Sequence, residues 1–245
     1  MPSPEHDLAR ARRYYDRFAA TYEAHRDGHG RYHDWLDARE VEFAAPAVAG
    51  REVLEVGCGT GLLLRAFARL ARRAVGVDLS PKMLEAARAR GLEVVEGSAT
   101  ALPFAGASFD LAVSFKTLPH VPDLAQALAE MARVVRPGGL LIVELYNPWS
   151  VRALVKRALP LRGAHGDERE VPTRFDDRAA LERALPAGCT IEQVRGLRVV
   201  TPAARALDLP VIGRALESAE RALADGPIGG WLGGLVVYRV RRDRS

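Results

Sequence analysis

The residues with the clearest chemical potential form a glycine-rich turn that directly follows an apolar stretch. The sequence from Val53 to Gly61 is VLEVGCGTG, which places glycines at positions 57, 59 and 61. Glycine lets the backbone turn sharply and approach a ligand, and the amides at the start of a following helix point toward that ligand. The segment therefore predicts a ligand-binding turn between a strand and a helix.

Two carboxylates beside this turn indicate the charge and shape of the ligand. Glu55 precedes the turn by two residues, where it would repel a pyrophosphate and attract a cationic group. Leu62 stands where the dinucleotide-binding fingerprint has its third glycine. Asp78 ends the next apolar stretch, about twenty residues on, and is placed to accept the hydroxyl protons of a ribose. These residues favour a cationic ligand with an unphosphorylated ribose over a nicotinamide dinucleotide.

A few other side chains could take part in chemistry, and each also has a purely structural interpretation. His120 follows the fourth predicted strand, where it would serve either as a general base or as a structural hydrogen-bonding group. Cys58 is predicted to be a small buried residue, because no base for a nucleophile is identifiable. His25, His29 and His33 are spaced by four, but intervening glycines interrupt the helix, so we expect no metal site.

Strand-like and helix-like patterns alternate from residue 51 onward, which is typical of a parallel sheet with crossover helices. Helices are expected over 61–71, 81–90 and 124–135, and the first 45 residues are expected to be helical. Residues 147–188 are expected to form helices and a polar loop. Strands are predicted at 52–56, 74–78, 92–96, 110–115 and 140–146, and later at 190–200 and 231–240.

The composition is that of an ordinary globular chain of 245 residues with a formal net charge of +4. Only three of its 35 basic residues are lysines, and acidic residues are interspersed with them, so the sequence disfavours nucleic-acid binding. Two cysteines cannot build a disulfide framework. The sequence shows no signal-peptide pattern and no apolar run of membrane-spanning length, so we expect a cytoplasmic protein.

Several segments together resemble class I S-adenosylmethionine-dependent methyltransferases, of the small-molecule type with a methyltransferase domain of family 11. Glu55 to Gly61 and Asp78 are similar to the first two motifs of that family. Three further segments, 96–110, 114–123 and 133–140, are similar to its later motifs, and the resemblance covers about residues 50 to 146. It implies a Rossmann-like, mostly parallel seven-stranded α/β sheet with an antiparallel last strand, helices on both faces and a helical N-terminal cap. It also implies transfer of a methyl group from S-adenosylmethionine to a small-molecule acceptor, at oxygen or carbon.

The resemblance implies roles for individual residues of the cofactor site. The three glycines would line the methionine and ribose portions, Glu55 would hold the ammonium group and Asp78 the ribose. Leu79 and Met83 would pack on the adenine, whose edge Ser98 and Ala99 would meet. Ser98 stands where the family commonly has aspartate, and serine accepts a hydrogen bond more weakly. The full set expected to bind the cofactor is Tyr22, Glu55, Gly57, Cys58, Gly59, Gly61, Asp78, Leu79, Met83, Ser98, Ala99 and Ser114.

The resemblance also suggests how the chain is divided. Residues 1–45 would form the cap, because the stretch from Tyr14 to Tyr22 resembles the cap helix of small-molecule methyltransferases; the alternative is a helix that only packs its aromatic rings. Residues 46–245 would form the methyltransferase domain, with 147–188 as a substrate lid. The alternative functions are a non-catalytic S-adenosylmethionine-binding protein and a nicotinamide-dependent oxidoreductase.

Two features bear on the acceptor. Lys116 follows the fourth predicted strand, where its charge would repel a sulfonium unless Glu55 or an anionic acceptor balances it. Residues 149–162, WSVRALVKRALPLR, predict an amphipathic basic helix capped by Ser150, with Arg152, Lys156 and Arg157 on its polar side. The simplest interpretation is a lid packed on the sheet, with Lys116 in solvent. The sharper hypothesis is an amphiphilic or acidic acceptor, with weak peripheral membrane contact through 149–162.

Overall fold

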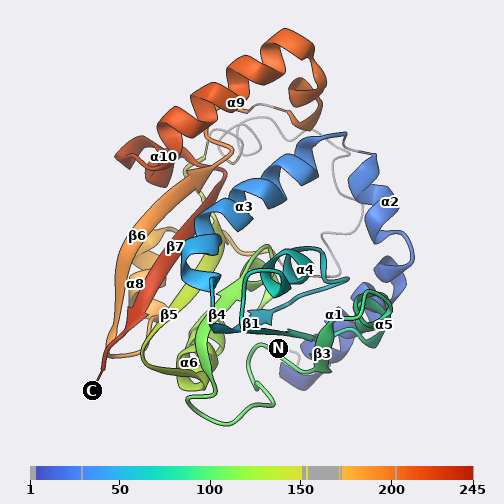
Figure 1. Cartoon of the computed structure of the whole chain (residues 1–245), viewed down its shortest axis with the longest axis vertical. Helices are drawn as coiled ribbons and strands as arrows, with labels where there is room; N and C mark the ends of the chain where they lie inside the picture. The colour runs from blue at the N-terminus through green and yellow to red at the C-terminus, as the bar shows by residue number, and fades with distance from the viewer. Residues whose placement is uncertain are drawn as a thin grey trace.

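A seven-stranded sheet forms the centre of the protein, as a computed structural model shows (Figure 1). The structure describes residues 4–28, 30–150, 153, 171, 173–201 and 203–244. The strands lie in the order β3-β2-β1-β4-β5-β7-β6. Their bounds are Glu52–Val56 (β1), Arg73–Asp78 (β2), Glu93–Glu96 (β3), Phe109–Ser114 (β4), Val135–Tyr146 (β5), Cys189–Leu197 (β6) and Leu235–Arg242 (β7).

Strand directions confirm the predicted sheet. The first five strands pair in parallel, whereas β7 runs antiparallel to both β5 and β6. Strand β5 begins at Val135, five residues before the predicted start at residue 140. Gly138 and Gly139 were expected to follow the end of the preceding helix, but they lie within the strand, where its register with β4 is irregular. The expected strand from residue 231 is wrong at its start. Trp231 lies in a short helix and is 65% exposed, and β7 begins only after Gly234.

Helices cover both faces of the sheet, and their apolar sides form two cores. One core joins the sheet to α6 and α8, and the other joins it to α3 and α4. Figure 1 shows α3 lying across the sheet and α9 and α10 beside β6. The helices are Pro4–Ala19 (α1), Tyr22–Asp27 (α2), Tyr32–Val48 (α3), Leu62–Ala68 (α4), Pro81–Ala89 (α5), Leu124–Val134 (α6), Arg178–Ala184 (α8), Pro210–Ala224 (α9) and Pro227–Leu232 (α10), with 3-10 turns at Leu118–His120 (η1) and Ala204–Asp208 (η2).

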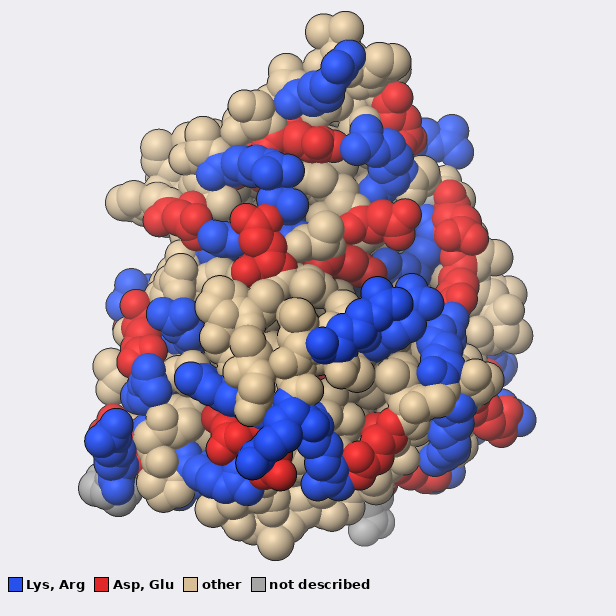
Figure 2. All heavy atoms as spheres, in the orientation of Figure 1, with Lys and Arg blue, Asp and Glu red and all other residues tan. Residues whose placement is uncertain are grey.

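Surface charge is mixed on the face drawn in Figure 2, where basic and acidic side chains alternate. Exposed ion pairs also occur between neighbouring helix residues, such as Arg178 with Glu182 and Lys82 with Glu85. The face in Figure 2 therefore shows no continuous basic surface. Within the described residues, no helix has the length and apolar character needed to cross a membrane.

The N-terminal helices are attached to the edge of the sheet where β2 ends. Asp16 of α1 accepts hydrogen bonds from the Ser80 hydroxyl (2.6 Å) and the Lys82 amide (3.3 Å), which lie where α5 begins. Glu23 of α2 pairs with Arg90 beyond α5. Helix α3 crosses the predicted boundary at residue 45 and belongs to the layer on the sheet, because Phe43, Ala44 and Val48 are buried in the second core.

A buried charge cluster joins α3 to the carboxyl ends of β4 and β5. The ammonium of Lys116 lies 2.8 Å from Asp37 Oδ1 and 2.7 Å from Glu40 Oε2, both on α3. The Lys116 amide donates to Glu144 Oε1 of β5 at 3.2 Å. Arg26 of α2 adds an ion pair to Asp37 at 2.5 Å. Glu40 and Glu144 are fully buried, so this cluster fixes α3 at the edge where parallel strands expose ligand sites.

Two carboxyl groups of the cluster face each other. Burial raises the pKa of both Glu40 and Glu144, and the attraction of Lys116 acts in the opposite direction. The carboxylate neighbours of Lys116 keep the pKa of its ammonium high, although burial lowers it. Two buried carboxyl groups that interact resist being charged together, so folding favours a proton on this pair.

Replacing one member of the pair by its amide should change how stability depends on pH. A carboxyl group whose pKa is raised by folding stabilises the folded state at low pH, and this contribution is lost as pH rises through the folded pKa. Glu144→Gln removes one of the two titrating carboxyl groups, so this pH-dependent contribution is reduced in the variant. We expect the melting temperature of the wild type to fall relative to Glu144→Gln between pH 6 and pH 9, by about 3 °C for each tenfold change in proton affinity.

Thermal unfolding followed by circular dichroism measures this difference. Glu130→Gln is the control, because Arg133 lowers the pKa of Glu130. Removing the Glu130 carboxylate should therefore lower stability at neutral pH, which is the opposite sign of effect. Parallel curves for the wild type and Glu144→Gln across this pH range would show that the pair holds no proton.

Candidate active site

The glycine-rich turn is tied to the end of the neighbouring strand. The amides of Gly57 and Cys58 both donate to the carbonyl of Val77, at 2.7 and 3.1 Å. Gly57 has a φ of 77°, and a Cβ there would overlap the side chain of Thr117. Gly59 has a φ of 53°, yet no protein atom lies within 4 Å of the position its Cβ would take. The turn therefore presents backbone to an open side, as the sequence predicts.

Asp78 is held at this turn by two backbone amides. Its Oδ2 accepts from Gly59 N at 2.8 Å and its Oδ1 from Ser80 N at 2.9 Å. Burial raises the pKa of Asp78, although these amide donors act in the opposite direction. Each carboxylate oxygen keeps accepting capacity beyond its one amide bond. The structure thus joins Asp78 and Gly59, which are 19 positions apart, in one site.

Glu55 and Thr60 carry polar atoms that the protein itself leaves without a partner. Glu55 is 2% exposed, and its Oε2 has no hydrogen-bond partner among the described residues. The same holds for the hydroxyl of Thr60, which the sequence analysis did not single out. Burial raises the pKa of Glu55, and Lys116 partly offsets this. A buried carboxylate without a partner is costly, so an ammonium-bearing ligand fits this position.

The residues expected to contact the adenine lie next along the chain. Leu79 follows Asp78, and Met83 is buried on α5, whose first turn is capped by the Ser80 hydroxyl. Ser98 and Ala99 are half-buried after β3. The Ser98 hydroxyl lies 2.8 Å from the Thr100 hydroxyl and accepts from the Thr100 amide at 3.2 Å. The Ser98 hydroxyl is thus hydrogen-bonded within a local turn. It has less capacity to accept a hydrogen bond from a ligand than an aspartate at this position would have.

Two other residues expected at the cofactor serve the protein framework. The Ser114 hydroxyl is fully buried and donates to the carbonyl of Val56 at 2.9 Å, so it joins the ends of β4 and β1. Cys58 is 6% exposed and packs with Leu64 and Leu84 in a small apolar cluster. Burial raises the pKa of its thiol, which keeps it protonated and unreactive.

Aromatic side chains from α1 and α2 reach the same edge. Burial raises the pKa of Tyr15 on α1, and electrostatic interactions with Tyr146 and Asp78 act in the same direction. Tyr22, which the sequence placed at the cofactor, lies under the guanidinium of Arg26 with 5.8 Å between Cζ and the ring centroid. Sequence reasoning missed Tyr15 and Tyr146 as site residues. The resemblance of residues 14–22 to a cap helix could have indicated Tyr15. No sequence pattern around Tyr146 indicates a functional role.

His120 lies at the carboxyl end of β4 in a polar and aromatic setting. Its Nδ1 is 3.4 Å from the hydroxyl of Thr173, and its ring meets Tyr146 edge to face at a centroid distance of 5.7 Å. Phe175 stacks beyond Tyr146 at 6.0 Å. Arg174 fixes the loop by donating its amide to Pro119 O at 2.7 Å. The imidazole of His120 thus lies between the Thr173 hydroxyl at Nδ1 and the ring of Tyr146.

The structure corrects the expectation for Lys116. Its charge is balanced by Asp37 and Glu40, not by Glu55 or solvent, because α3 brings two carboxylates from 79 and 76 positions away. The helix expected at 149–162, with Arg152, Lys156 and Arg157, lies largely outside the described residues. Ser150 is described, and its hydroxyl accepts from the Ala153 amide at 3.2 Å, as a cap would. His29 also lies outside the described residues.

Comparison with known proteins agrees with this geometry. A family model described as a methyltransferase domain matches residues 54–143. A "probable S-adenosylmethionine-dependent methyltransferase" of Mycolicibacterium smegmatis is 34% identical over 199 residues, which are 79% of this chain and 74% of that protein. A ubiquinone biosynthesis O-methyltransferase of Thiobacillus denitrificans is 39% identical over 119 residues, 46% of this chain and 51% of that enzyme.

A solved structure shows the same fold. The crystal structure of an S-adenosylmethionine-dependent methyltransferase from Thermotoga maritima aligns with a TM-score of 0.67, at 23% identity, over 94% of this chain and 98% of that one. The relationship to the Mycolicibacterium protein extends over most of both sequences, and the matched family segment contains Glu55, the glycine turn and Asp78. The chain is therefore a class I S-adenosylmethionine-dependent methyltransferase, an enzyme that uses S-adenosylmethionine as its methyl donor.

Proposed function

We propose that the enzyme methylates an oxygen or carbon atom of a small, flat, hydroxylated aromatic molecule. Three observations support a small acceptor of this kind. The rings of Tyr15, Tyr146 and Phe175 gather with His120 at the carboxyl edge of the sheet. Helices α1 and α2 are held over that edge by ion pairs. The Thiobacillus relative is named as an O-methyltransferase of ubiquinone biosynthesis.

For the cofactor we propose contacts from the turn and the ends of the first three strands. Glu55 would hold the ammonium group, the backbone at Gly57, Gly59 and Gly61 would line the methionine and ribose, and Asp78 would bind the ribose hydroxyls. The observation that carries this assignment is the buried Oε2 of Glu55, which has no partner among the described residues. Leu79, Met83, Ser98, Ala99 and Tyr22 would surround the remaining parts. Cys58 and Ser114 would stabilise the turn through contacts within the protein, Cys58 by apolar packing and Ser114 by its hydrogen bond to Val56.

His120 is the proposed base for the acceptor. S-Adenosylmethionine supplies a sulfonium methyl with a good leaving group, so alignment and exclusion of water provide much of the rate. A phenolic or enolic hydroxyl gains nucleophilicity when its proton passes to a positioned imidazole. Thr173 beside Nδ1 would orient the ring so that Nε2 receives that proton. Lys116 is already neutralised by two carboxylates, which removes the observation that favoured an acidic acceptor.

The division of the chain and its membrane contact stay predictions. We propose residues 1–45 as the cap and 147–188 as the lid over the acceptor. The hypothesis that 149–162 touches a membrane depends on residues outside the described ones. Co-sedimentation with anionic vesicles would test it directly.

The reaction can be tested without knowing the acceptor in advance. Purified enzyme is incubated with S-adenosylmethionine and a cell extract, and mass spectrometry searches for metabolites that gain one methyl group. We expect methylated phenols or quinols, together with formation of S-adenosylhomocysteine. Methylation confined to proteins or nucleic acids would contradict the proposal.

Asp78→Asn should weaken cofactor binding. The substitution keeps the shape but removes the charge that strengthens hydrogen bonds to the ribose, a loss of about 1.5–3 kcal/mol and hence about ten- to a hundredfold in affinity. Calorimetric titration with S-adenosylhomocysteine measures this, with no binding of NAD expected for either protein. Glu93→Gln, at the far end of β3 in an exposed pair with Arg73, is the matched control. Unchanged affinity in Asp78→Asn would remove the ribose assignment.

His120→Ala should slow turnover with the acceptor found above while preserving cofactor affinity. Loss of a positioned base costs about 10²–10⁴ in rate. Steady-state kinetics and calorimetry on the same preparations separate the two effects. Turnover within a few-fold of wild type would mean that His120 only closes the loop between β4 and α6.

A further inference from the structure

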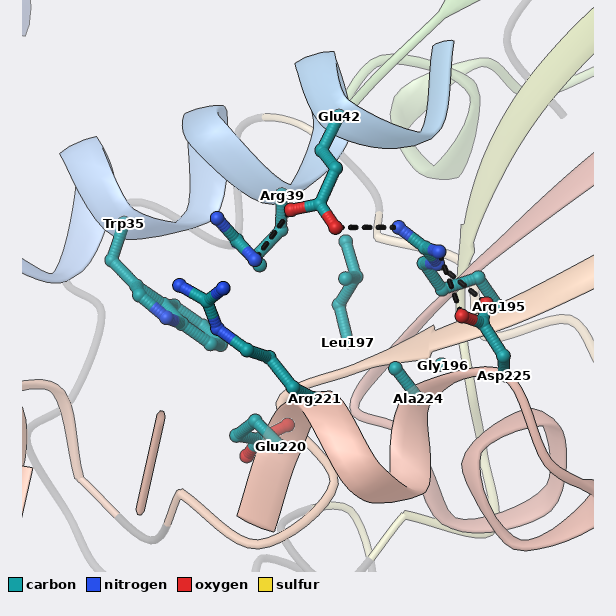
Figure 3. Close-up of a pocket in the computed structure, with 10 residues that line it drawn as sticks. All are labelled: Trp35, Arg39, Glu42, Arg195, Gly196, Leu197, Glu220, Arg221, Ala224 and Asp225. Atoms are coloured by element: carbon teal, nitrogen blue, oxygen red, sulfur yellow. Dashed lines mark hydrogen bonds and ion pairs between the residues drawn. The ribbon is translucent and has the colours of Figure 1, made fainter. Parts of the chain in front are cut away.

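A second pocket lies away from the glycine turn, between α3, β6 and α9 (Figure 3). Its volume is about 40 Å³, room for roughly three water-sized groups. Trp35, Arg39 and Glu42 of α3 line one side, and Glu220, Arg221 and Asp225 line the other. Because a helix turns by about 100° per residue, these α3 positions lie opposite Asp37 and Glu40, which face the charge cluster.

Three donor groups in this pocket lack acceptors. Trp35 is 7% exposed, and its indole Nε1 has no hydrogen-bond partner among the described residues. The Nε of Arg39 is buried and equally unpartnered. Arg221 makes no ion pair or hydrogen bond within the described part of the chain, and Figure 3 shows its guanidinium reaching from α9 toward Trp35 and Arg39. The guanidinium of Arg221, the Nε of Arg39 and the indole N–H of Trp35 thus lie at one pocket with no acceptor assigned to them within the described residues.

The carboxylates that line the pocket are committed elsewhere. Asp225 makes a two-point pair with Arg195, at 2.6 and 2.7 Å. Glu42 pairs with Arg39 on its own helix and lies 3.7 Å from Arg195. Glu220 is 3% exposed and accepts four hydrogen bonds from the segment 199–201, each 2.8 or 2.9 Å long. Glu42 thus neutralises Arg39, whereas Arg221 has no counterion within the described part of the chain.

We propose that this pocket binds a small oxyanion, either a phosphate or a carboxylate group, through Arg221, Arg39 and the indole N–H of Trp35. An oxyanion has only acceptor atoms, which matches the three donors left over once Glu42, Glu220 and Asp225 are engaged by other groups. Guanidinium groups bind planar or tetrahedral oxyanions through paired N–H bonds, and burial of one side strengthens them. The site is separate from the methyl-transfer site and does not depend on the proposed acceptor.

Calorimetric titration of the full chain tests the site, with sodium phosphate in one series and sodium acetate in another, at constant ionic strength set by sodium chloride. We expect saturable binding of at least one anion, and the anion bound identifies the group as phosphate or carboxylate. Arg221→Met and Trp35→Phe should each weaken it about tenfold, because each removes a hydrogen bond to a charged group. Trp35→Phe keeps the ring and removes only the donor.

Arg214→Met is the matched control, since Arg214 lies on the same helix and bonds only its own helix start at Pro210 O. Its affinity for the anion should equal that of the wild type. Affinity for S-adenosylhomocysteine, measured on every variant, verifies folding without reference to the new site. Absence of saturable binding by both anions, or equal losses in Arg221→Met and Arg214→Met, would overturn the proposal.

Discussion

The ammonium of Lys116 is removed from water at the end of β4, and its carboxylate partners come from a helix that precedes the whole sheet in sequence. An unpaired charge in such a place would cost several kcal/mol, so this lysine cannot be buried unless α3 docks. The reverse also holds, because Glu40 and Glu144 are fully buried carboxyl groups whose neighbouring cation is Lys116. Docking of α3, closure of the β4–β5 edge and formation of the active site are therefore parts of one event.

The same cluster sets the electrostatic character of the active site. With one carboxyl group protonated, Asp37, Glu40 and Glu144 balance the charges of Lys116 and Arg26, and Glu55 and Asp78 add carboxylates nearby. S-Adenosylmethionine carries an ammonium, a sulfonium and one carboxylate. A site with excess negative charge favours that net cation, and the pairing of Lys116 removes the repulsion its ammonium would otherwise exert on a sulfonium.

Sequence reasoning succeeded where the determinants are local. The turn from Gly57 to Gly61 and the strand ending at Asp78 follow from glycine geometry and apolar patterns within a few residues, and both lie where expected. It failed where partners are distant. Nothing around Lys116 indicates Asp37 or Glu40, which only the packing of α3 brings near. Trp231 was assigned to a strand by its apolar neighbours, although close backbone contacts of Gly229 with Gly196 hold this segment in a helix.

Helix α3 contributes residues to both the charge cluster and the pocket against α9, from opposite sides of the helix. Its inner side supplies Asp37 and Glu40 to the cluster, and its outer side supplies Trp35 and Arg39 to the pocket against α9. A helix is stiff over this length, so the charge cluster that fixes the inner side also fixes the donors on the outer side. Arg39 pairs with Glu42 on the same helix, whereas its Nε and the indole N–H of Trp35 have no partner among the described residues. The position of these two donors thus follows from the constraint that builds the active site.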